Sequence, residues 1–253
     1  MLRSRIARQT MPRWTELLRS VNNLKLLAAI GRSGGDLHSV ADLVDNMLES
    51  PQMDACVRRF RSVPGGAEMM DQRYPPLQPD IERMIQMPAG SLGHGYARLI
   101  RELNYDPDFF RPRPIDTEAR WLTQRIATTH DIHHVVTGFG TGAVGENGVL
   151  MITANQIGFP AYVLLNSAAQ LSSFRQQSTQ RPVQLDFEQL SAALAQAMAI
   201  ARTASCLAAV RWEEGWERPV QSWREELGIA DPADLETYGL GTTVQGMGSD
   251  ITP

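Results

Sequence analysis

The chain has 253 residues, of which 43% are hydrophobic and 21% are charged, and its formal net charge is −4. This length and composition are typical of one globular domain with a sizeable core, and the acidic balance excludes the basic footprint of a nucleic-acid-binding protein. The two cysteines, Cys56 and Cys206, are too few for a disulfide scaffold or a cysteine metal site, and they suit a reducing compartment.

The N-terminal segment is basic. Its first fifteen residues contain no acidic residue and four arginines, Arg3, Arg5, Arg8 and Arg13. Such a start could be an organellar transit segment or an amphipathic segment that touches anionic lipid. Because it is short and lacks the apolar region of a secretory signal, we interpret it as an ordinary N-terminus with some attraction to membranes.

Apolar residues at helical spacing predict three helices in the first sixty residues. The first covers residues 14–30 and ends at Gly31, with its inward face formed by Trp14, Leu17, Leu18, Val21, Leu24 and Leu27. The second follows an N-cap at Asp36 and runs to about Leu48. The third starts at Pro51 and ends near Phe60.

Residues 64–66 and 74–76 contain proline and interrupt the chain without a low-complexity linker, so we expect them to form corners within one domain. A helix is then predicted from Ser91 through Leu103. The proline-rich residues 104–114 are expected to form a surface connection.

The stretch from His130 to Glu146 contains a distinctive motif, which is His-Asp-x-x-His, eleven residues, and then Glu. It follows an apolar helical pattern that begins at Trp121 and that nothing breaks before Gly138. Three glycines within five residues then predict a tight turn, and a second helix is expected to start near Gly142. We therefore predict an antiparallel helical hairpin with Glu146 in the first turns of its second helix.

Helical geometry gathers metal-binding side chains in this hairpin. At about 100° per residue, His130 and His134 lie about 40° apart on one helix face, and Asp131 lies about 60° beyond His134. Folding the chain back at the turn brings Glu146 level with both histidines. Two imidazoles with one or two carboxylates are typical ligands of a catalytic Zn²⁺ or Fe²⁺ site, so these four residues are the candidate metal ligands and catalytic residues.

The alternative is a structural role, because a single histidine on a helix usually packs in the core or meets solvent. The aspartate, the turn and the matched glutamate favour the metal site over that alternative. His133 points to the other side of His130, and we interpret it as a supporting or surface residue.

No charged residue occurs from Asn147 to Phe174. This length could indicate a transmembrane span, but the stretch contains several amide side chains, which are costly in hydrocarbon. We therefore predict a buried central helix that is kinked or interrupted around Gly158 and Pro160.

The last helical pattern is rich in alanine and predicts a long helix from Phe187 to Val210. Three tryptophans follow among charged residues, and we expect them to be core anchors rather than an interfacial belt: Trp212, Trp216 and Trp223. The polar, glycine-rich residues 231–253 are expected to be a flexible tail. Together these patterns predict an all-α fold, with a single-domain helical bundle over residues 1–230 built around the metal-bearing hairpin.

At the motif, the chain resembles the coenzyme Q (ubiquinone) biosynthesis family Coq4, whose hallmark is the same His-Asp-x-x-His, eleven residues, Glu. The resemblance covers roughly residues 12–229. Further matching blocks are Ser91-Leu92-Gly93, Tyr96-Ala97-Arg98, Asp106-Pro107-Asp108, Gln124-Arg125, Thr141, Gly145-Glu146, Gln156, Gly158, Pro160, Trp212-Glu213 and Arg224 to Gly228. The chain departs from the family at Ala127-Thr128, where a basic-acidic pair is usual, and at Gly140, where proline is usual.

The resemblance implies metal-dependent, oxidative removal of the ring carboxyl group from a polyprenyl-hydroxybenzoate precursor of ubiquinone at a membrane surface. It assigns the metal to His130, Asp131, His134 and Glu146. We expect a divalent metal, Zn²⁺ first, with Fe²⁺, Mn²⁺ or Mg²⁺ as alternatives. The alternative from another class is a non-catalytic scaffold that binds prenyl lipid and organises other quinone-biosynthesis enzymes. A metal-dependent phosphohydrolase ranks last, because only five histidines are present.

The implied substrate, a polyprenyl quinone precursor or another isoprenoid lipid, requires an apolar groove beside the hairpin. The candidate lipid-binding residues are Leu150, Ile157, Phe159 and Tyr162. The other expected partners are a peripheral membrane surface, quinone-biosynthesis enzymes and a second copy of the chain in a homodimer. The expected location is cytoplasmic at the membrane surface for a bacterial chain, and the alternative is the matrix side of the mitochondrial inner membrane.

Overall fold

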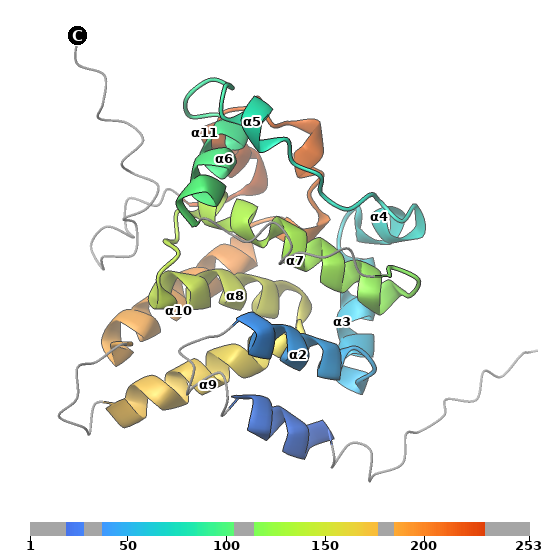
Figure 1. Ribbon diagram of the computed structural model, residues 1–253, viewed down its shortest axis with the longest axis vertical. Helices are drawn as coiled ribbons and strands as arrows, with labels where there is room; N and C mark the ends of the chain where they lie inside the picture. Colours follow the sequence, from blue (N-terminus) through green and yellow to red (C-terminus); the bar gives the residue numbers. More distant parts are fainter. Residues whose placement is uncertain (1–18, 28–36, 104–113, 177–184, 231–253) are drawn as a thin grey trace, which may run out of the picture.

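The fold is all-α, as predicted. The structure is a computed structural model that describes residues 19–27, 37–103, 114–176 and 185–230. These residues form helices and no β-strand, and the one β-bridge among them joins Ser91 and Pro219 (Figure 1).

The helices before the hairpin are a short one over residues 19–27 and five with named bounds: α2 (Leu37–Met47), α3 (Pro51–Ser62), α4 (Gly66–Asp71), α5 (Ile81–Met84) and α6 (Leu92–Leu103). The hairpin itself consists of α7 (Glu118–Thr137) and α8 (Ala143–Ile157). It is followed by α9 (Pro160–Gln176), α10 (Phe187–Thr203), the 3₁₀ turns η1 (Leu207–Ala209) and η2 (Trp212–Glu214), and α11 (Val220–Leu227).

Helices α7 and α8 lie in the middle of the molecule, with α6 and α11 above α7 in the view of Figure 1, α9 below α8 and α10 behind it. One apolar cluster joins α6, α7, α8, α10 and the C-terminal segment around Trp212 and Trp223. A second cluster joins α2, α3, α4, the first half of α7 and the first half of α9 around Phe60 and Trp121. The hairpin contributes to both clusters, so its position is fixed from both sides.

The predicted break in the uncharged stretch is confirmed. Gly158 caps the end of α8 with φ 71°, a left-handed conformation that glycine adopts without strain, and α9 begins at Pro160. The prediction that the whole stretch is buried is wrong for α9. Val163, Leu171 and Phe174 are 44%, 60% and 62% exposed, because after the break α9 runs along the edge of the molecule (Figure 1). None of the described helices is long and apolar enough to cross a membrane.

The prediction of one helix from Phe187 to Val210 is also wrong, because α10 ends at Thr203. The side chain of Gln156 takes over the backbone hydrogen bonds that the helix would otherwise have made. Its amide donates to the carbonyl of Ser205 at 3.0 Å, and its Oε1 accepts from the amide N–H of Leu207 at 3.0 Å. The tryptophan prediction is confirmed, since Trp212 and Trp223 are buried and Trp216 is half-buried.

The N-terminal prediction holds in part. Residues 19–27 are helical, but Val21 and Leu24 are 43% and 68% exposed instead of inward, because this short helix packs on α2 and the second cluster mainly through Leu26 and Leu27. The basic start, the Asp36 cap, the 104–113 connection and the 231–253 tail lie outside the described residues.

Candidate metal centre

The hairpin turn is built from glycines that allow its parts to approach closely. Gly138 ends α7 in the left-handed region with φ 80°, and its N–H donates to the carbonyl of His134. A Cβ placed on Gly145, in the first turn of α8, would lie 1.9 Å from the carbonyl oxygen of Gly140. A Cβ on Gly148 would lie 2.7 Å from the ring of Phe139. The missing side chains therefore let α8 sit directly against the turn.

Three of the four predicted ligands meet at this point. The Nε2 atom of His130 lies 3.0 Å from one carboxylate oxygen of Glu146, and Nε2 of His134 lies 3.3 Å from the other. The two imidazole Nε2 atoms are 3.1 Å apart. One donor atom from each residue thus lies within 4.8 Å of the others, an arrangement that fits the ligand set of a small divalent cation.

The ring of His134 is held in one orientation. Its Nδ1 lies 3.0 Å from the carbonyl oxygen of Phe139, so Nδ1 carries the proton and donates, and Nε2 is left with its lone pair towards the centre. His134 is fully buried, whereas the side chain of Glu146 is 35% exposed. A ligand would therefore approach the centre from the Glu146 side.

The charges in the centre favour an ion pair when no metal is bound. Burial works against a charged His130, but the nearby carboxylate of Glu146 and its hydrogen bond outweigh burial and raise the pKa of His130. Burial also favours the neutral acid of Glu146, yet the two histidines hold the pKa of that carboxyl well below its usual range. A metal ion would take the place of the proton on His130, so metal binding releases that proton.

Asp131, the fourth predicted ligand, is buried at 3% exposure but is not among the donor atoms that converge. Its negative charge acts on the phenols of Tyr96 and Tyr162 and contributes to raising the pKa of both. This position agrees with the helical geometry, since Asp131 lies beyond His134 on the α7 surface. The structure therefore brings together His130, His134 and Glu146, with Asp131 at the side of the centre.

His133 is fully buried on the other side of α7, so it is not a surface residue. Its ring packs against Trp212 with 6.2 Å between ring centroids. Neither ring nitrogen makes a hydrogen bond of good geometry in the described part of the chain, although the backbone of Leu207 lies near the ring. Burial and the nearby charges of His130, His134 and Arg125 hold the pKa of His133 well below 6.5, so the ring stays neutral.

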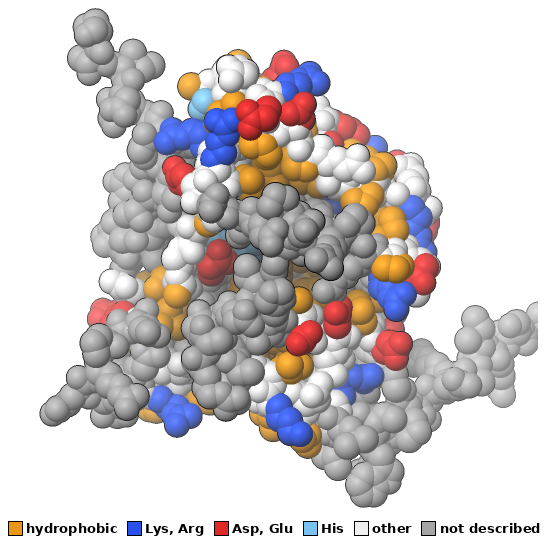
Figure 2. Space-filling model, viewed as in Figure 1, with side chains coloured by type: hydrophobic (Ala, Val, Ile, Leu, Met, Phe, Trp, Pro, Cys, Tyr) orange, Lys and Arg blue, Asp and Glu red, His pale blue; other side chains and the backbone are white. Residues whose placement is uncertain are grey.

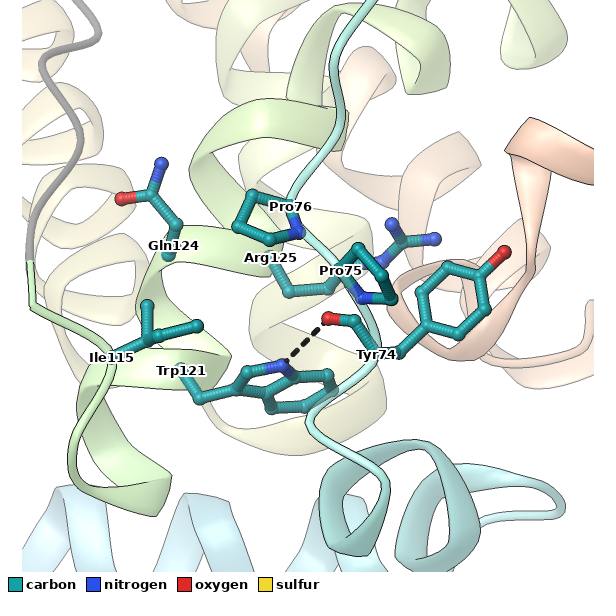
Figure 3. A pocket seen from close by; sticks show the side chains of 7 residues that line it. All are labelled: Tyr74, Pro75, Pro76, Ile115, Trp121, Gln124 and Arg125. Carbon is teal, nitrogen blue, oxygen red and sulfur yellow. Dashed lines mark hydrogen bonds between the residues drawn. The ribbon is translucent and has the colours of Figure 1, made fainter.

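The candidate lipid-binding residues lie in or against the second cluster. The buried core of this cluster includes Ile157, Phe159 and Tyr162, and Leu150 is half-buried against it. This packing does not test whether the four residues bind lipid, and the lipid role stays a prediction. The hollow drawn in Figure 3 lies elsewhere, at the 74–76 corner and the start of α7. It is a shallow depression lined by Tyr74, Pro75, Pro76, Ile115, Trp121, Gln124 and Arg125. None of the four lipid candidates lines it.

Sequence spacing missed two residues that act on the hairpin. Arg224 of α11 donates from Nε to the carbonyl of Val136 at 2.7 Å and so stabilises the last turn of α7. Tyr162 of α9 is a candidate lipid-binding residue, and its ring centroid also lies 6.1 Å from that of His130. Both residues are far from the motif in sequence, so no local pattern could reveal their positions.

The fold and this cluster define an all-helical protein with a His₂–Glu centre in a helical hairpin. The family model for coenzyme Q (ubiquinone) biosynthesis protein Coq4 matches residues 17–233, and the chain therefore belongs to the Coq4 family. The resemblance drawn from the motif is confirmed.

Individual relatives agree with this assignment. The chain is 28% identical to the mitochondrial ubiquinone biosynthesis protein COQ4 homolog of Rattus norvegicus, over 82% of this chain and 71% of the relative. It is 30% identical to the mitochondrial ubiquinone biosynthesis protein COQ4 of Eremothecium gossypii, over 79% of this chain and 58% of the relative. The fold is similar to the crystal structure of a Nostoc punctiforme protein named for ubiquinone biosynthesis, with a TM-score of 0.72 and 24% identity, over 84% of this chain and 97% of that one.

Proposed function

We propose that this chain acts in ubiquinone biosynthesis as a metal-dependent enzyme that removes the ring carboxyl group from a polyprenyl-hydroxybenzoate. The observation that carries the proposal is the convergence of His130, His134 and Glu146 within 4.8 Å, in a member of the Coq4 family. Family membership supports the pathway, and the ligand set supports metal chemistry rather than a purely structural hairpin.

The chain's own residues would hold the metal and present its open side to the substrate. His134 binds through Nε2 because its Nδ1–H is held by Phe139, and Glu146 supplies the negative charge that offsets part of the cation's charge. When bound, a divalent cation supplies positive charge that stabilises a substrate carboxylate or phenolate as carbon dioxide leaves. Three protein ligands leave positions for substrate oxygens, which is the arrangement of a catalytic rather than a structural site.

The overall reaction has two balanced forms. Loss of carbon dioxide leaves the bonding electron pair on the ring carbon, and a proton added there gives the simple decarboxylated phenol. Replacement of the carboxyl group by hydroxyl is instead a two-electron oxidation. With dioxygen as the oxidant and water as the source of the new hydroxyl oxygen, the products are the phenol, carbon dioxide and hydrogen peroxide. The oxidative form favours a redox-active ion such as Fe²⁺ over Zn²⁺, because the filled d shell of zinc cannot transfer electrons.

Exposed apolar side chains favour the membrane-surface part of the proposal. Leu171 and Phe174 of α9 and Leu24 of the 19–27 helix are each at least 60% exposed. On the face shown in Figure 2, hydrophobic side chains along the lower edge lie beside lysine or arginine side chains. An apolar edge with basic neighbours suits the surface of an anionic bilayer, where a polyprenyl substrate would reside. We expect the chain to lie at the membrane that holds its substrate. The relatives named above from Rattus norvegicus and Eremothecium gossypii are mitochondrial proteins.

A complementation experiment separates the enzyme from the scaffold. A cell that lacks its own family member should regain ubiquinone from the intact chain, but should accumulate the carboxylated precursor with His134→Ala. The control is His94→Ala, which removes a half-buried imidazole outside the centre, whose Nδ1 lies 3.1 Å from the carbonyl oxygen of Ile85. Full synthesis with a folded, abundant His134→Ala protein would refute catalysis and leave the lipid-binding scaffold as the function.

A further inference from the structure

Tyr162 lies beside the candidate metal centre because of the break between α8 and α9. The break ends α8 at Gly158 and α9 begins at Pro160, which places Tyr162 in the first turn of α9. The Tyr162 ring meets the His130 ring edge to face, with 6.1 Å between centroids, and packs on Phe159 at 4.8 Å. The Tyr162 residue is 7% exposed, so its ring is held in place by its packing against His130 and Phe159.

No hydrogen bond is found for the hydroxyl group of Tyr162 in the described part of the chain. Although the ring is buried, the oxygen is not among the fully buried polar atoms that lack a partner, so it is available to donate to a ligand. A phenol has an ordinary pKa of about 10, so it carries its proton at neutral pH and can donate it to an anionic oxygen.

The other phenol near the centre has a different environment. The ring of Tyr96 packs on Trp216 with 5.6 Å between centroids. Tyr162 contacts a candidate metal ligand, His130, directly through its ring. Of the two, Tyr162 is the phenol placed at the centre itself.

From this placement we infer that Tyr162 is a ligand-contacting residue, which donates a hydrogen bond to an anionic oxygen, carboxylate or phenolate, bound at the open side of the metal centre. The inference rests on the metal centre of the proposed function and adds the residue that orients its ligand. The Tyr162 hydroxyl can bind an aromatic acid through this hydrogen bond, but it cannot bind an apolar prenyl chain in this way, because the prenyl chain has no oxygen to accept the bond. It would therefore hold the head group of the substrate while the chain lies elsewhere.

The test uses the full chain loaded with Co²⁺, whose visible absorption changes when a ligand oxygen binds. The probe is 4-hydroxybenzoate, a soluble head group without a prenyl chain. Wild-type protein should show a saturable spectral change, and Tyr162→Phe should bind the same amount of Co²⁺ but bind the probe about tenfold more weakly or worse, as expected for loss of a hydrogen bond to a charged group. Tyr74→Phe, which removes a phenol near the exposed Glu214, should bind the probe like wild type.

The outcomes distinguish the inference from the proposed function. Equal probe affinity in Tyr162→Phe and wild type would overturn the inference and leave the metal centre intact. Wild-type protein that binds Co²⁺ but not 4-hydroxybenzoate would likewise overturn the inference and leave the metal centre intact. Absence of Co²⁺ binding by folded wild-type protein would overturn both. If Tyr162→Phe is folded by circular dichroism but does not bind Co²⁺, Tyr162 shapes the centre itself and the ligand-contacting role is wrong.

Discussion

Gly145→Ala should open the metal centre without unfolding the protein. The added Cβ would lie 1.9 Å from the carbonyl oxygen of Gly140, whereas Cβ contacts in real structures essentially never fall below 3.0 Å. The first turn of α8 must therefore move away from the turn by about 1 Å or more. The clash is with backbone, so no side-chain rotation can relieve it.

The same movement carries Glu146 away from the histidines, because Glu146 is the next residue in α8. Its carboxylate oxygens now lie 3.0 Å and 3.3 Å from the two Nε2 atoms, and a metal site tolerates errors of only about 0.2 Å in its ligand distances. We expect zinc affinity to fall by tenfold to a hundredfold or more, and the free energy of unfolding to fall by about 1–3 kcal/mol from overpacking.

Competition with a chromophoric chelator measures the zinc affinity, and urea unfolding followed by circular dichroism measures the stability. Gly142→Ala is the matched control, because it also adds one methyl group at the turn, but its φ is −73° and nothing lies within 4 Å of the new Cβ. Equal zinc affinity in Gly145→Ala and Gly142→Ala would show that the packing of the turn does not position the ligands.

Three further predictions concern the surroundings of the centre. In the metal-free protein, the free energy of unfolding should fall by about 1.4 kcal/mol per pH unit below pH 6.5, because the lowered pKa of His133 lets the unfolded chain bind a proton that the folded chain does not. Urea unfolding of His133→Phe at several pH values should lack this part of the slope. An unchanged slope would contradict the prediction. Glu213→Gln should cost about 3 kcal/mol in urea unfolding, because it leaves the buried Arg125 guanidinium, 2.5 Å from Glu213, without its counter-charge. The control Glu214→Gln breaks only an exposed pair and should cost under about 1 kcal/mol, so equal losses would refute the argument. The double variant with Leu171→Glu and Phe174→Glu should lose sedimentation with anionic vesicles while keeping its zinc, and undiminished sedimentation would exclude α9 as the membrane contact.

The hairpin could be predicted from the sequence because its determinants are local. The spacing of His130 and His134 fixes their common face, and the glycines at 138, 140 and 142 fix the turn. Given the turn, the position of Glu146 follows from counting residues. The end of α7 and the start of α8 accordingly lie where the pattern placed them.

The features that could not be predicted depend on contacts between distant parts of the chain. The alanine-rich pattern after Phe187 continues past Thr203, but Gln156, about fifty residues earlier, supplies the hydrogen bonds that let α10 end there. The sequence likewise predicts an apolar α9 but not which side packs, since that depends on where the chain turns at Gly158. Tyr162 reaches the centre for the same reason.

The central claim is that His130, His134 and Glu146 together bind one divalent metal ion. X-ray absorption at the metal edge, on protein purified without chelator and with its metal content measured, tests this directly. We predict one ion per chain with two imidazole nitrogens and a carboxylate oxygen at about 2.0–2.2 Å, and loss of the ion in a Glu146→Ala protein that keeps its helical content. A folded wild-type chain that binds no stoichiometric metal, or whose ion keeps the same ligands after Glu146→Ala, would contradict the claim.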